Sequence, residues 1–384
     1  MKVSELQEVC EVIAGQSPPS DTYNQSNVGV PFFQGKADFG ELFPTVRYWC
    51  SKPTKISIPN DILFSVRAPV GPTNINNTEA CIGRGLSALR CKDDKVIMKY
   101  LLHFLRASEE IISNLGTGST FKAITISELK KIQIPLPPLE QQKRIAAILD
   151  AADTYRQLTK ALIAKYDELT QSLFLDMFGD PVKNEKGWEI KKFSEFTSKY
   201  NQGVNTTTEK IIYTEYGTFP IIRAGEVGKG QLNFNSVVWV DEENQTRIKD
   251  ACKPKFGDVL YANIGANLGT ACLVETTREF GIAWNVFRIQ LTQDINKIFF
   301  VYQLNSDSMR KKVWSNVKTA TVPFISGKQI AELNFINPNQ IIQNQFAERV
   351  QVIEQQKAQA QASLEKAEEL FASLLQKAFK GEIT

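Results

Sequence analysis

The stretch IQIPLPPLEQQKRIAAILDAAD, residues 132–153, decides the fold because a proline-rich run opens directly onto a charged segment. Pro135, Pro137 and Pro138 have a fixed φ and no amide donor, and proline is tolerated only in the first turn of a helix. The strand-like run before them must therefore end there. The sequence predicts that a helix begins near Leu139.

The predicted helix is unusually long. Apolar residues recur at spacings of three or four from Ile145 to Met177, which is typical of one apolar stripe on one helix. Gly179 and Pro181 then supply a stop signal, a left-handed cap followed by a residue that cannot continue the helix. About forty residues give a helix of roughly 60 Å, which needs a partner of similar length.

The partner is predicted by an internal repeat. A shift of 201 residues brings the C-terminal region onto this helix, and smaller shifts align parts of the two globular halves. The matched pairs include Gln142 with Gln343, Thr120 with Thr321, Leu173 with Leu374, Asp61 with Asp258 and Ser4 with Ser194. These matches indicate that the chain is one unit written twice.

The repeat predicts an α+β fold, with two mixed α/β domains that are each followed by a long helix. The two helices are expected to pack against each other, because each needs a partner of similar length. The expected boundaries are 1–136 for the first domain, 137–181 for the central helix, 182–336 for the second domain and 337–384 for the C-terminal helix. The expected seam has Leu149, Leu162, Leu169 and Leu173 facing Val350, Ile353, Leu364, Leu370 and Leu374.

The composition suits a soluble, two-part protein of 384 residues. No apolar run is long enough to span a bilayer and the N-terminus has no signal-peptide core, so we expect a cytoplasmic protein without a membrane role. Six cysteines at scattered spacings suit free thiols in a reducing compartment. The single histidine, His103, lies in the apolar run YLLHFL and is expected in the core rather than at a ligand site.

Charge is distributed unevenly along the chain. The net charge is only +3, but basic residues outnumber acidic ones in both globular halves, whereas the reverse holds in both long helices. This pattern is compatible with an anionic partner for the globular halves.

Loops in both halves combine glycine, asparagine and threonine with arginine, lysine and aromatic residues. These are the side chains that contact phosphates and base edges in nucleic-acid complexes. The expected contacts in these loops are Gln34, Lys36, Arg47, Arg67, Arg223, Lys229, Asn233, Asn235 and Asn263. The alternative is that these are ordinary polar surface loops.

A sharper signal comes from NLGTGSTFKAIT, residues 114–125, and its counterpart NVKTATVPFIS, residues 316–326. Small hydroxyl and glycine residues let backbone N–H groups approach a phosphate closely, and a nearby lysine adds charge. The expected contacts here are Thr117, Ser119, Thr120, Lys122, Lys318, Thr319 and Thr321. A plain Ser/Thr-rich turn is the alternative, but recurrence in both halves favours a nucleic-acid role.

Enzymatic interpretations find little support. The run NPNQ at 337–340 lacks the glycine-rich loop that a methyl-donor cofactor needs, and AGEVGKGQ lacks the spacing of a nucleotide-binding loop. Asp180, Glu189 and Lys191 form a loose nuclease-like arrangement, but the other repeat has no matching glutamate. We therefore predict no catalytic residue, no metal site and no cofactor.

The runs GSTFKAITISELKKIQIPLPPLEQQKRIAAIL and GWEIKKFSEF, the GDVL run and the duplicated long helices resemble the specificity subunit of type I restriction-modification systems. The likeness covers essentially the whole chain. The second copy departs from the pattern, because INPNQIIQNQFAERV replaces the proline-rich opening and a glutamine-rich run, QVIEQQKAQAQAS, follows.

This resemblance implies that each domain reads one half of a bipartite target in double-stranded DNA. It also implies that the two helices pack as an antiparallel coiled coil with pseudo-two-fold symmetry. In this family the helices set the spacing and dock two methyltransferase (M) subunits, to which motor-nuclease (R) subunits attach. The chain itself would not be an enzyme. The competing hypothesis is a structural or protein-binding adaptor whose basic loops are incidental.

Overall fold

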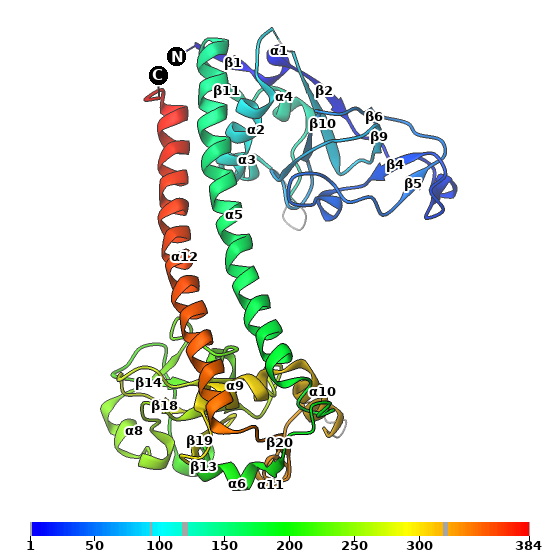
Figure 1. The fold of residues 1–384 in the computed structure, drawn as a ribbon. Coiled ribbons are helices and arrows are strands. Elements are labelled where there is room, and N and C mark those ends of the chain that lie inside the picture. The colour runs from blue at the N-terminus through cyan, green and yellow to red at the C-terminus, as the bar shows by residue number, and fades with distance from the viewer. Residues whose placement is uncertain (1, 93, 117–121, 318–321, 384) are drawn as a thin grey trace. The chain divides into compact units, whose positions relative to one another are not determined.

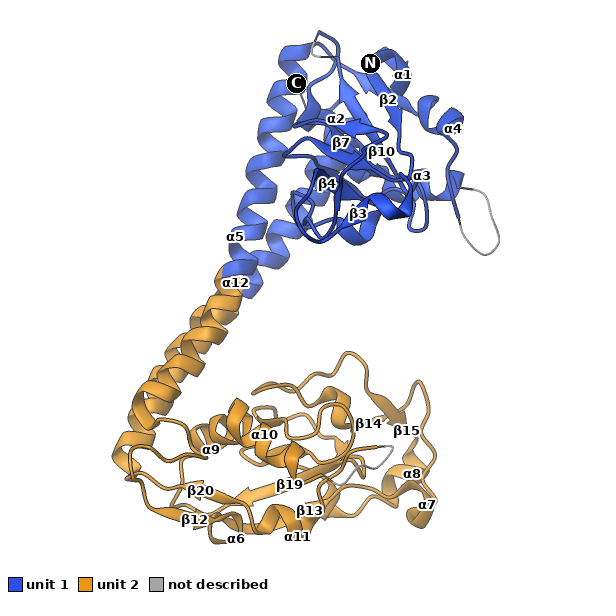
Figure 2. Ribbon diagram, turned by 90° about the vertical axis from the view of Figure 1, so that its right-hand side faces the viewer, with its two compact units in different colours: residues 1–161, 361–384 blue, residues 162–360 orange. Residues whose placement is uncertain are grey.

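The computed structural model describes residues 2–92, 94–116, 122–317 and 322–383. It divides into two compact units (Figure 2): unit 1 comprises Met1–Ala161 and Gln361–Thr384, and unit 2 comprises Leu162–Ala360. Two long helices, α5 (Leu139–Phe178) and α12 (Gln340–Lys380), contribute residues to both units. Each unit therefore contains one globular domain and one part of each long helix.

The ends of α5 follow from its sequence. The helix begins directly after Pro138, whose carbonyl accepts hydrogen bonds from the amides of Gln141 and Gln142. It ends before Gly179, which has a φ of +75° and donates its amide to the Leu175 carbonyl, as a left-handed cap requires. The prediction of a single helix between the prolines and this glycine is confirmed.

Unit 1 is a mixed α/β domain (Figure 1), and its described residues form three small sheets. The first sheet pairs β1 (Lys2–Glu5) with β11 (Gln133–Leu136). The second has the strand order β2 (Cys10–Ala14), β10 (Leu86–Cys91), β7 (Ile62–Ser65) and β8 (Thr73–Ile75). The third has the order β3 (Tyr23–Asn24), β5 (Trp49–Cys50), β4 (Val30–Phe33), β9 (Ala80–Ile82) and β6 (Ile56–Ser57). The short helices are α1 (Leu6–Val9), η1 (Ser20–Thr22), η2 (Lys36–Asp38), α2 (Met98–Ala107), α3 (Glu109–Leu115) and α4 (Ile126–Lys130).

Unit 2 is built in the same way. Its sheets are β12 (Ile190–Lys192) with β20 (Asn334–Ile336); β13 (Thr197–Gln202), β19 (Val286–Leu291), β16 (Val259–Ala262) and β17 (Ala271–Leu273); and β15 (Val238–Val240), β14 (Phe219–Ile222) and β18 (Gly281–Ile282). Its short helices are α6 (Phe193–Phe196), α7 (Thr206–Glu209), η3 (Ala224–Glu226), α8 (Glu242–Thr246), η4 (Asp250–Cys252), α9 (Lys297–Asn305), α10 (Asp307–Ser315) and α11 (Gly327–Ala331).

The internal repeat is visible in the strand pairing. The order β2-β10-β7-β8 in unit 1 matches β13-β19-β16-β17 in unit 2, and the parallel pair β4–β9 matches β14–β18. Two residues matched in the sequence hold the same place. Asp61 accepts hydrogen bonds from Arg90 Nε and Nη2 at 3.0 Å, and Asp258 accepts one from Arg288 Nε at 2.6 Å. Both carboxylates are buried, so each pair ties two neighbouring strands together.

A second repeated contact fixes the start of each long helix. The buried Gln142 accepts a hydrogen bond from the Ile97 amide at 2.9 Å and donates to the Pro137 carbonyl at 2.9 Å. The buried Gln343 accepts from the Asn296 amide at 2.8 Å and donates to the Pro338 carbonyl at 2.7 Å. Each glutamine therefore binds its helix to the segment just before the main domain helix, α2 or α9.

The cores of the two units each include side chains from both long helices. In unit 1, Leu149 of α5 and Phe371 of α12 pack with α2, where the buried His103 lies, as predicted for a core histidine. In unit 2, Phe174 of α5 and Phe346 of α12 meet at a centroid distance of 5.6 Å. Within each unit the two helix segments run antiparallel.

The helix seam differs from the predicted one. Leu149 and Val350 are buried, and Leu173, Ile353, Leu364 and Leu374 are half-buried. Leu162, Leu169 and Leu370 are instead 45%, 49% and 56% exposed, so their assignment to the seam was wrong. The buried helix positions there include Thr159, Thr170, Phe174, Phe178, Ala360 and Ala367.

The error has a geometric cause. Spacings of three or four fit more than one line of side chains on a helix, and at about 100° per residue Leu162 and Phe174 point roughly 120° apart. The aromatic and alanine line faces the partner helix, and ion pairs flank it: Lys160 to Glu368 at 2.9 Å in unit 1 and Lys357 to Asp167 at 2.5 Å in unit 2. The leucine line faces outward.

Candidate nucleic-acid interface

In unit 1, a tight turn after β4 carries several of the predicted contact residues. The carboxylate of Asp38, at the end of η2, is almost fully buried and accepts hydrogen bonds from the backbone amides of Gln34 at 2.7 Å and Gly35 at 3.3 Å. Its other oxygen accepts a hydrogen bond from Arg47 Nε at 2.9 Å. Gln34 and Lys36 are exposed, and half of the Arg47 side chain is exposed.

The same carboxylate acts on the charge of Arg47. The hydrogen bond that Arg47 donates to Asp38, reinforced by the attraction between the two charges, raises the pKa of the Arg47 guanidinium above its ordinary value. Arg47 therefore stays charged, and its planar fork is held in one orientation at the protein surface.

In unit 2, the turn after β14 has the same design. The buried carboxylate of Glu226, at the end of η3, accepts hydrogen bonds from the backbone amide of Arg223 at 2.9 Å and from Arg223 Nη2 at 3.1 Å. Arg223 also donates to the Ser236 carbonyl at 2.9 Å, and its side chain is 40% exposed. Asn233 and Asn235 lie exposed on the returning arm, where the Asn235 amide donates to Asn233 Oδ1 at 2.8 Å.

The remaining predicted contacts have different positions. Arg67 and Lys122 are exposed, and a backbone bridge from Arg67 to Ala123 brings their segments together. Asn263 is buried, and its backbone carbonyl accepts a hydrogen bond from the Ile325 amide at 2.9 Å, so its prediction as a DNA contact was wrong. Asn263 directly follows β16, and a polar residue after a strand is typical of an exposed loop. In the structure this position is part of the buried core. Thr117, Ser119, Thr120, Lys318, Thr319 and Thr321 lie outside the described residues.

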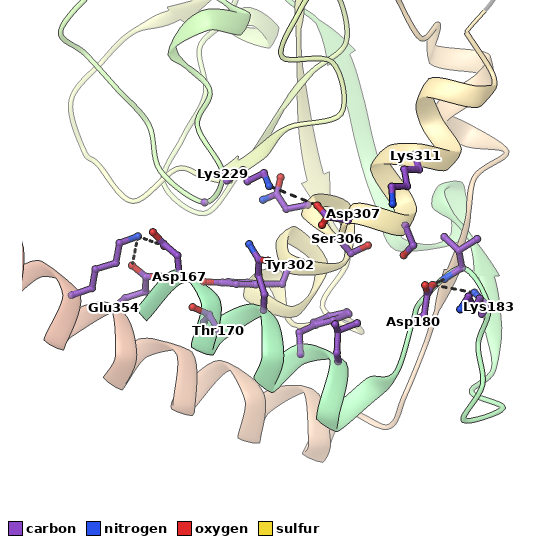
Figure 3. Close-up of a pocket in the computed structure, with 18 residues that line it drawn as sticks. Asp167, Thr170, Asp180, Lys183, Lys229, Tyr302, Ser306, Asp307, Lys311 and Glu354 are labelled. Carbon is purple, nitrogen blue, oxygen red and sulfur yellow. Dashed lines mark hydrogen bonds and ion pairs between the residues drawn. The ribbon is translucent and has the colours of Figure 1, made fainter. Parts of the chain in front are cut away.

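Lys229 borders a cavity of about 780 Å³ in unit 2 (Figure 3). Its ammonium group lies 3.9 Å from Asp307 at the start of α10. The walls come from α5, α9, α10 and α12 and from the segments after α5 and after η3. They carry lysines and carboxylates in equal number: Lys183, Lys229, Lys311 and Lys357 with Asp167, Asp180, Asp307 and Glu354. Because these charges balance, the cavity offers no strong attraction for an anion.

The nuclease-like carboxylates Asp180 and Glu189 do not form part of a metal-binding cluster in the described part of the chain. Among the described residues no group of three or more His, Cys, Asp or Glu side chains could hold a metal ion. Asp180 accepts a hydrogen bond from the Val182 amide at 2.8 Å, and Glu189 lies 3.6 Å from Lys191, so both carboxylates have structural contacts. Within the same ranges, no helix is both long and apolar enough to cross a membrane.

The sequence analysis did not predict the anchoring role of Asp38 and Glu226, because in a sequence a buried carboxylate looks like any acidic residue of a loop. The sequence did contain a signal for this role. A shift of 188 residues places Asp38-Phe39-Gly40 on Glu226-Val227-Gly228, an acid and a glycine at the same spacing after a strand. The shifts that align the other matched pairs differ from this one, so they leave the two turns unaligned.

The chain resembles known proteins throughout its length. Residues 1–166 match the family model described as the type I restriction modification DNA specificity domain. A specificity subunit assigned to the MjaX type I restriction enzyme of Methanocaldococcus jannaschii is 48% identical over 143 residues, 37% of this chain and 34% of that protein. The match thus spans about a third of that relative's own length.

Two further matches extend over most of the chain. The EcoKI specificity subunit of Escherichia coli is 25% identical over 384 residues, which covers 91% of this chain and 80% of that one. The crystal structure of the type I restriction-modification S subunit from M. genitalium has the same fold, with a TM-score of 0.61, 16% identity and coverage of 98% and 96%. Over most of its length, this chain is thus similar to specificity subunits of type I restriction-modification systems.

Proposed function

We propose that this chain is the DNA-recognition subunit of a type I restriction-modification complex and that each globular domain reads one half of a bipartite target in double-stranded DNA. The observation that carries this proposal is the pair of turns anchored by Asp38 and Glu226. They share one backbone design but present different side chains, as two readers of two different sequences would. The chain alone neither cuts nor methylates DNA.

The proposed domains are residues 1–136 and 182–336, joined through the helices. Arg67 and Lys122 in unit 1 are the proposed phosphate contacts, because both are exposed cations on adjoining segments. Thr117, Ser119, Thr120, Lys318, Thr319 and Thr321 are proposed as further DNA contacts from the sequence alone.

The proposed protein partners are two methyltransferase subunits, with motor-nuclease subunits attached to them, and the proposed location of the complex is the cytoplasm. On α5, Tyr155 and Leu158 in unit 1 and Leu162 and Leu169 in unit 2 are exposed. Large apolar side chains left uncovered at helical spacing are typical of a surface that binds another protein. The exposed leucines are the proposed methyltransferase contacts on this helix.

Salt dependence separates this function from a structural adaptor. If about six phosphates are neutralised, the logarithm of the DNA association constant should fall with the logarithm of salt concentration with a slope of roughly five. Affinity is measured on the full chain with its methyltransferase subunits bound. Arg67→Gln and Lys122→Gln should each reduce the slope by about one. Lys366→Gln on α12, exposed and outside both the domains and the proposed docking surface, is the matched control and should not change the slope. A flat salt response of the unmodified protein would favour the adaptor.

A further inference from the structure

The two anchored turns can be aligned residue by residue, with a constant shift of 188 along the returning arm. The Asp38 carbonyl accepts a hydrogen bond from the Thr45 amide at 2.8 Å, and the Glu226 carbonyl accepts one from the Asn233 amide at 2.9 Å. Two further contacts repeat. The bridge Phe39–Pro44 matches Val227–Leu232, and the bond from the Gly40 amide to the Phe43 carbonyl matches that from Gly228 to Gln231. On this arm Arg47 therefore corresponds to Asn235.

The other arm supplies a second pair of equivalent positions. Gln34 directly follows β4, and Arg223 directly follows β14, and these two strands are the ones paired in parallel with β9 and β18. In both cases the turn carboxylate accepts a hydrogen bond from the backbone amide of this residue, at 2.7 Å for Gln34 and 2.9 Å for Arg223. Gln34 therefore corresponds to Arg223.

An amide and a guanidinium have thus exchanged places between the two domains. Unit 1 has the amide on the first arm and the guanidinium, Arg47, on the second, whereas unit 2 has the guanidinium, Arg223, on the first arm and the amide, Asn235, on the second. In both units the guanidinium donates to the buried turn carboxylate. Each side chain keeps a large exposed part, 50% for Arg47 and 40% for Arg223.

These chemistries match particular bases. A guanidinium binds O6 and N7 of guanine with two hydrogen bonds, and the amide of glutamine or asparagine binds N6 and N7 of adenine in the same manner. A guanidinium that already donates to a buried carboxylate is fixed in direction, so it meets a base edge with little loss of side-chain freedom. Arg223 would exchange its hydrogen bond to the Ser236 carbonyl for one to the base, because the other Nη2 hydrogen is donated to Glu226. A phosphate contact would need only the charge and not this anchoring.

We propose that Gln34 with Arg47, and Arg223 with Asn235, are the base-reading pairs of the two domains. Each pair reads a guanine through its guanidinium and an adenine through its amide. Asp38 and Glu226 are positioning residues for the two guanidinium groups. This inference rests on the proposed function, because it requires the domains to bind DNA.

The competing explanation is that Arg47 and Arg223 form purely structural ion pairs, because a buried carboxylate needs a nearby cation whether or not that cation contacts DNA. The two explanations differ in what a lysine would do. Lysine keeps the positive charge but lacks the planar fork, so Arg47→Lys and Arg223→Lys should preserve overall DNA binding and weaken the guanine preference. A purely structural pair would change stability and leave base preference intact.

The test is selection of bound duplexes from a randomised DNA pool by the full chain in complex with its methyltransferase subunits, followed by sequencing. Arg47→Lys should reduce the preference for one guanine in one half-site by about tenfold and leave the other half-site unchanged. Arg223→Lys should do the converse, so each variant is the control for the other. Gln34→Ala and Asn235→Ala, whose side chains do not hold the carboxylates, should each relax one adenine.

The outcomes are separable. An unmodified protein that enriches a two-part motif, with lysine variants that keep the same guanine preference at equal folded fraction, would overturn the inference and leave the proposed function standing. An unmodified protein that enriches no motif would overturn both. If a lysine variant is unstable, the alanine variants decide: unchanged adenine preference in Gln34→Ala and Asn235→Ala removes both pairs from the base contacts.

Discussion

At the scale of single residues, the buried glutamines that begin the long helices are the clearest case of a side chain with a defined structural task. The fully buried Gln343 side chain accepts a hydrogen bond from the Asn296 amide and donates one to the Pro338 carbonyl, so it satisfies two backbone groups at the start of α9 and α12. Leaving buried backbone groups without a partner costs far more than the net gain of an ordinary hydrogen bond.

We expect Gln343→Ala to lower the free energy of unfolding of unit 2 by about 2–4 kcal/mol, from the unsatisfied backbone groups and the cavity left behind. Gln345→Ala removes the same side chain from an exposed position on the same helix and should change stability by no more than about 0.5 kcal/mol. Chemical denaturation of both variants measures the difference. Equal effects would show that the buried hydrogen bonds do not stabilise the helix start.

His103 offers a second prediction at this scale. Burial lowers the pKa of His103 below its ordinary value of 6.5, although its hydrogen bond to Asp150, at 2.8 Å, opposes that shift. The unfolded chain therefore binds more protons than the folded one just below pH 6.5, so stability should be lost as the pH falls from about 6.5 toward the folded-state pKa.

The measurement is simple because the sequence contains a single histidine. Its imidazole resonance in an NMR titration should give a pKa below 6.5, and Asp150→Asn should lower that pKa further by removing the opposing charge. His103→Gln should remove the part of the pH dependence of unfolding that falls in this window. A histidine that titrates at 6.5 or above would contradict the buried, neutral state.

At the scale of elements, the sequence predicted helix ends better than helix faces. Pro138 and Gly179 act on the backbone alone, so the start and end of α5 follow from local chemistry. The face that packs depends on the partner, and the spacing of Leu162 and Leu169 fitted the seam as well as that of Phe174 did. Only the three-dimensional structure shows that aromatic rings fill the interface.

The features of the candidate site were likewise predictable from the sequence only in part. Residue type led to the selection of Gln34, Arg47 and Arg223 as candidates, because amides and guanidinium groups are the usual readers of base edges, and their contact with DNA stays a prediction. Burial could not be predicted for Asn263, since a single polar residue after a strand looks the same whether the core ends there or continues. The role of the turn carboxylates needed the folded hydrogen-bond pattern.

The buried aromatic side chains of α5 and its exposed leucines should respond differently to substitution. Phe174→Ala removes a buried ring and should cost unit 2 about 3–5 kcal/mol. Leu169→Gln changes an exposed residue to another good helix former and should alter stability by no more than about 0.5 kcal/mol. Denaturation of each variant gives both values.

The same Leu169→Gln variant tests the proposed docking surface. It should weaken binding of the methyltransferase subunit, measured by titration of the folded chain. Ala164→Gln is the matched control, because Ala164 is also exposed on α5 but lies about 140° around the helix from Leu169. Equal binding by Leu169→Gln and the unmodified chain would remove Leu169 from this surface.

At the scale of the whole molecule, the long helices are the feature that both units share, because α5 and α12 each contribute to unit 1 and unit 2. The unit boundary falls at residue 161 in α5 and residue 360 in α12. Under the proposed function, helix length sets the number of unread base pairs between the half-sites.

Four residues inserted after Ala161, together with four after Ala360, would lengthen both helices and leave the contacts inside each unit intact, including Lys160–Glu368 and Lys357–Asp167. The insertion adds about 6 Å of rise and turns each helix only about 40° beyond a full turn. Because stacked bases lie about 3.4 Å apart, the recognised site should gain one or two base pairs of spacer, with both half-sites unchanged.

Mapping of methylated bases in cells that carry the complete restriction-modification gene set measures the spacer directly. A two-residue insertion at the same two points is the control, because it turns each helix by about 200° and should abolish methylation, as the packed faces on either side of the insertion no longer line up. One result for the four-residue variant would contradict this prediction. Full activity with an unaltered spacer would show that the helices do not determine the distance between the half-sites.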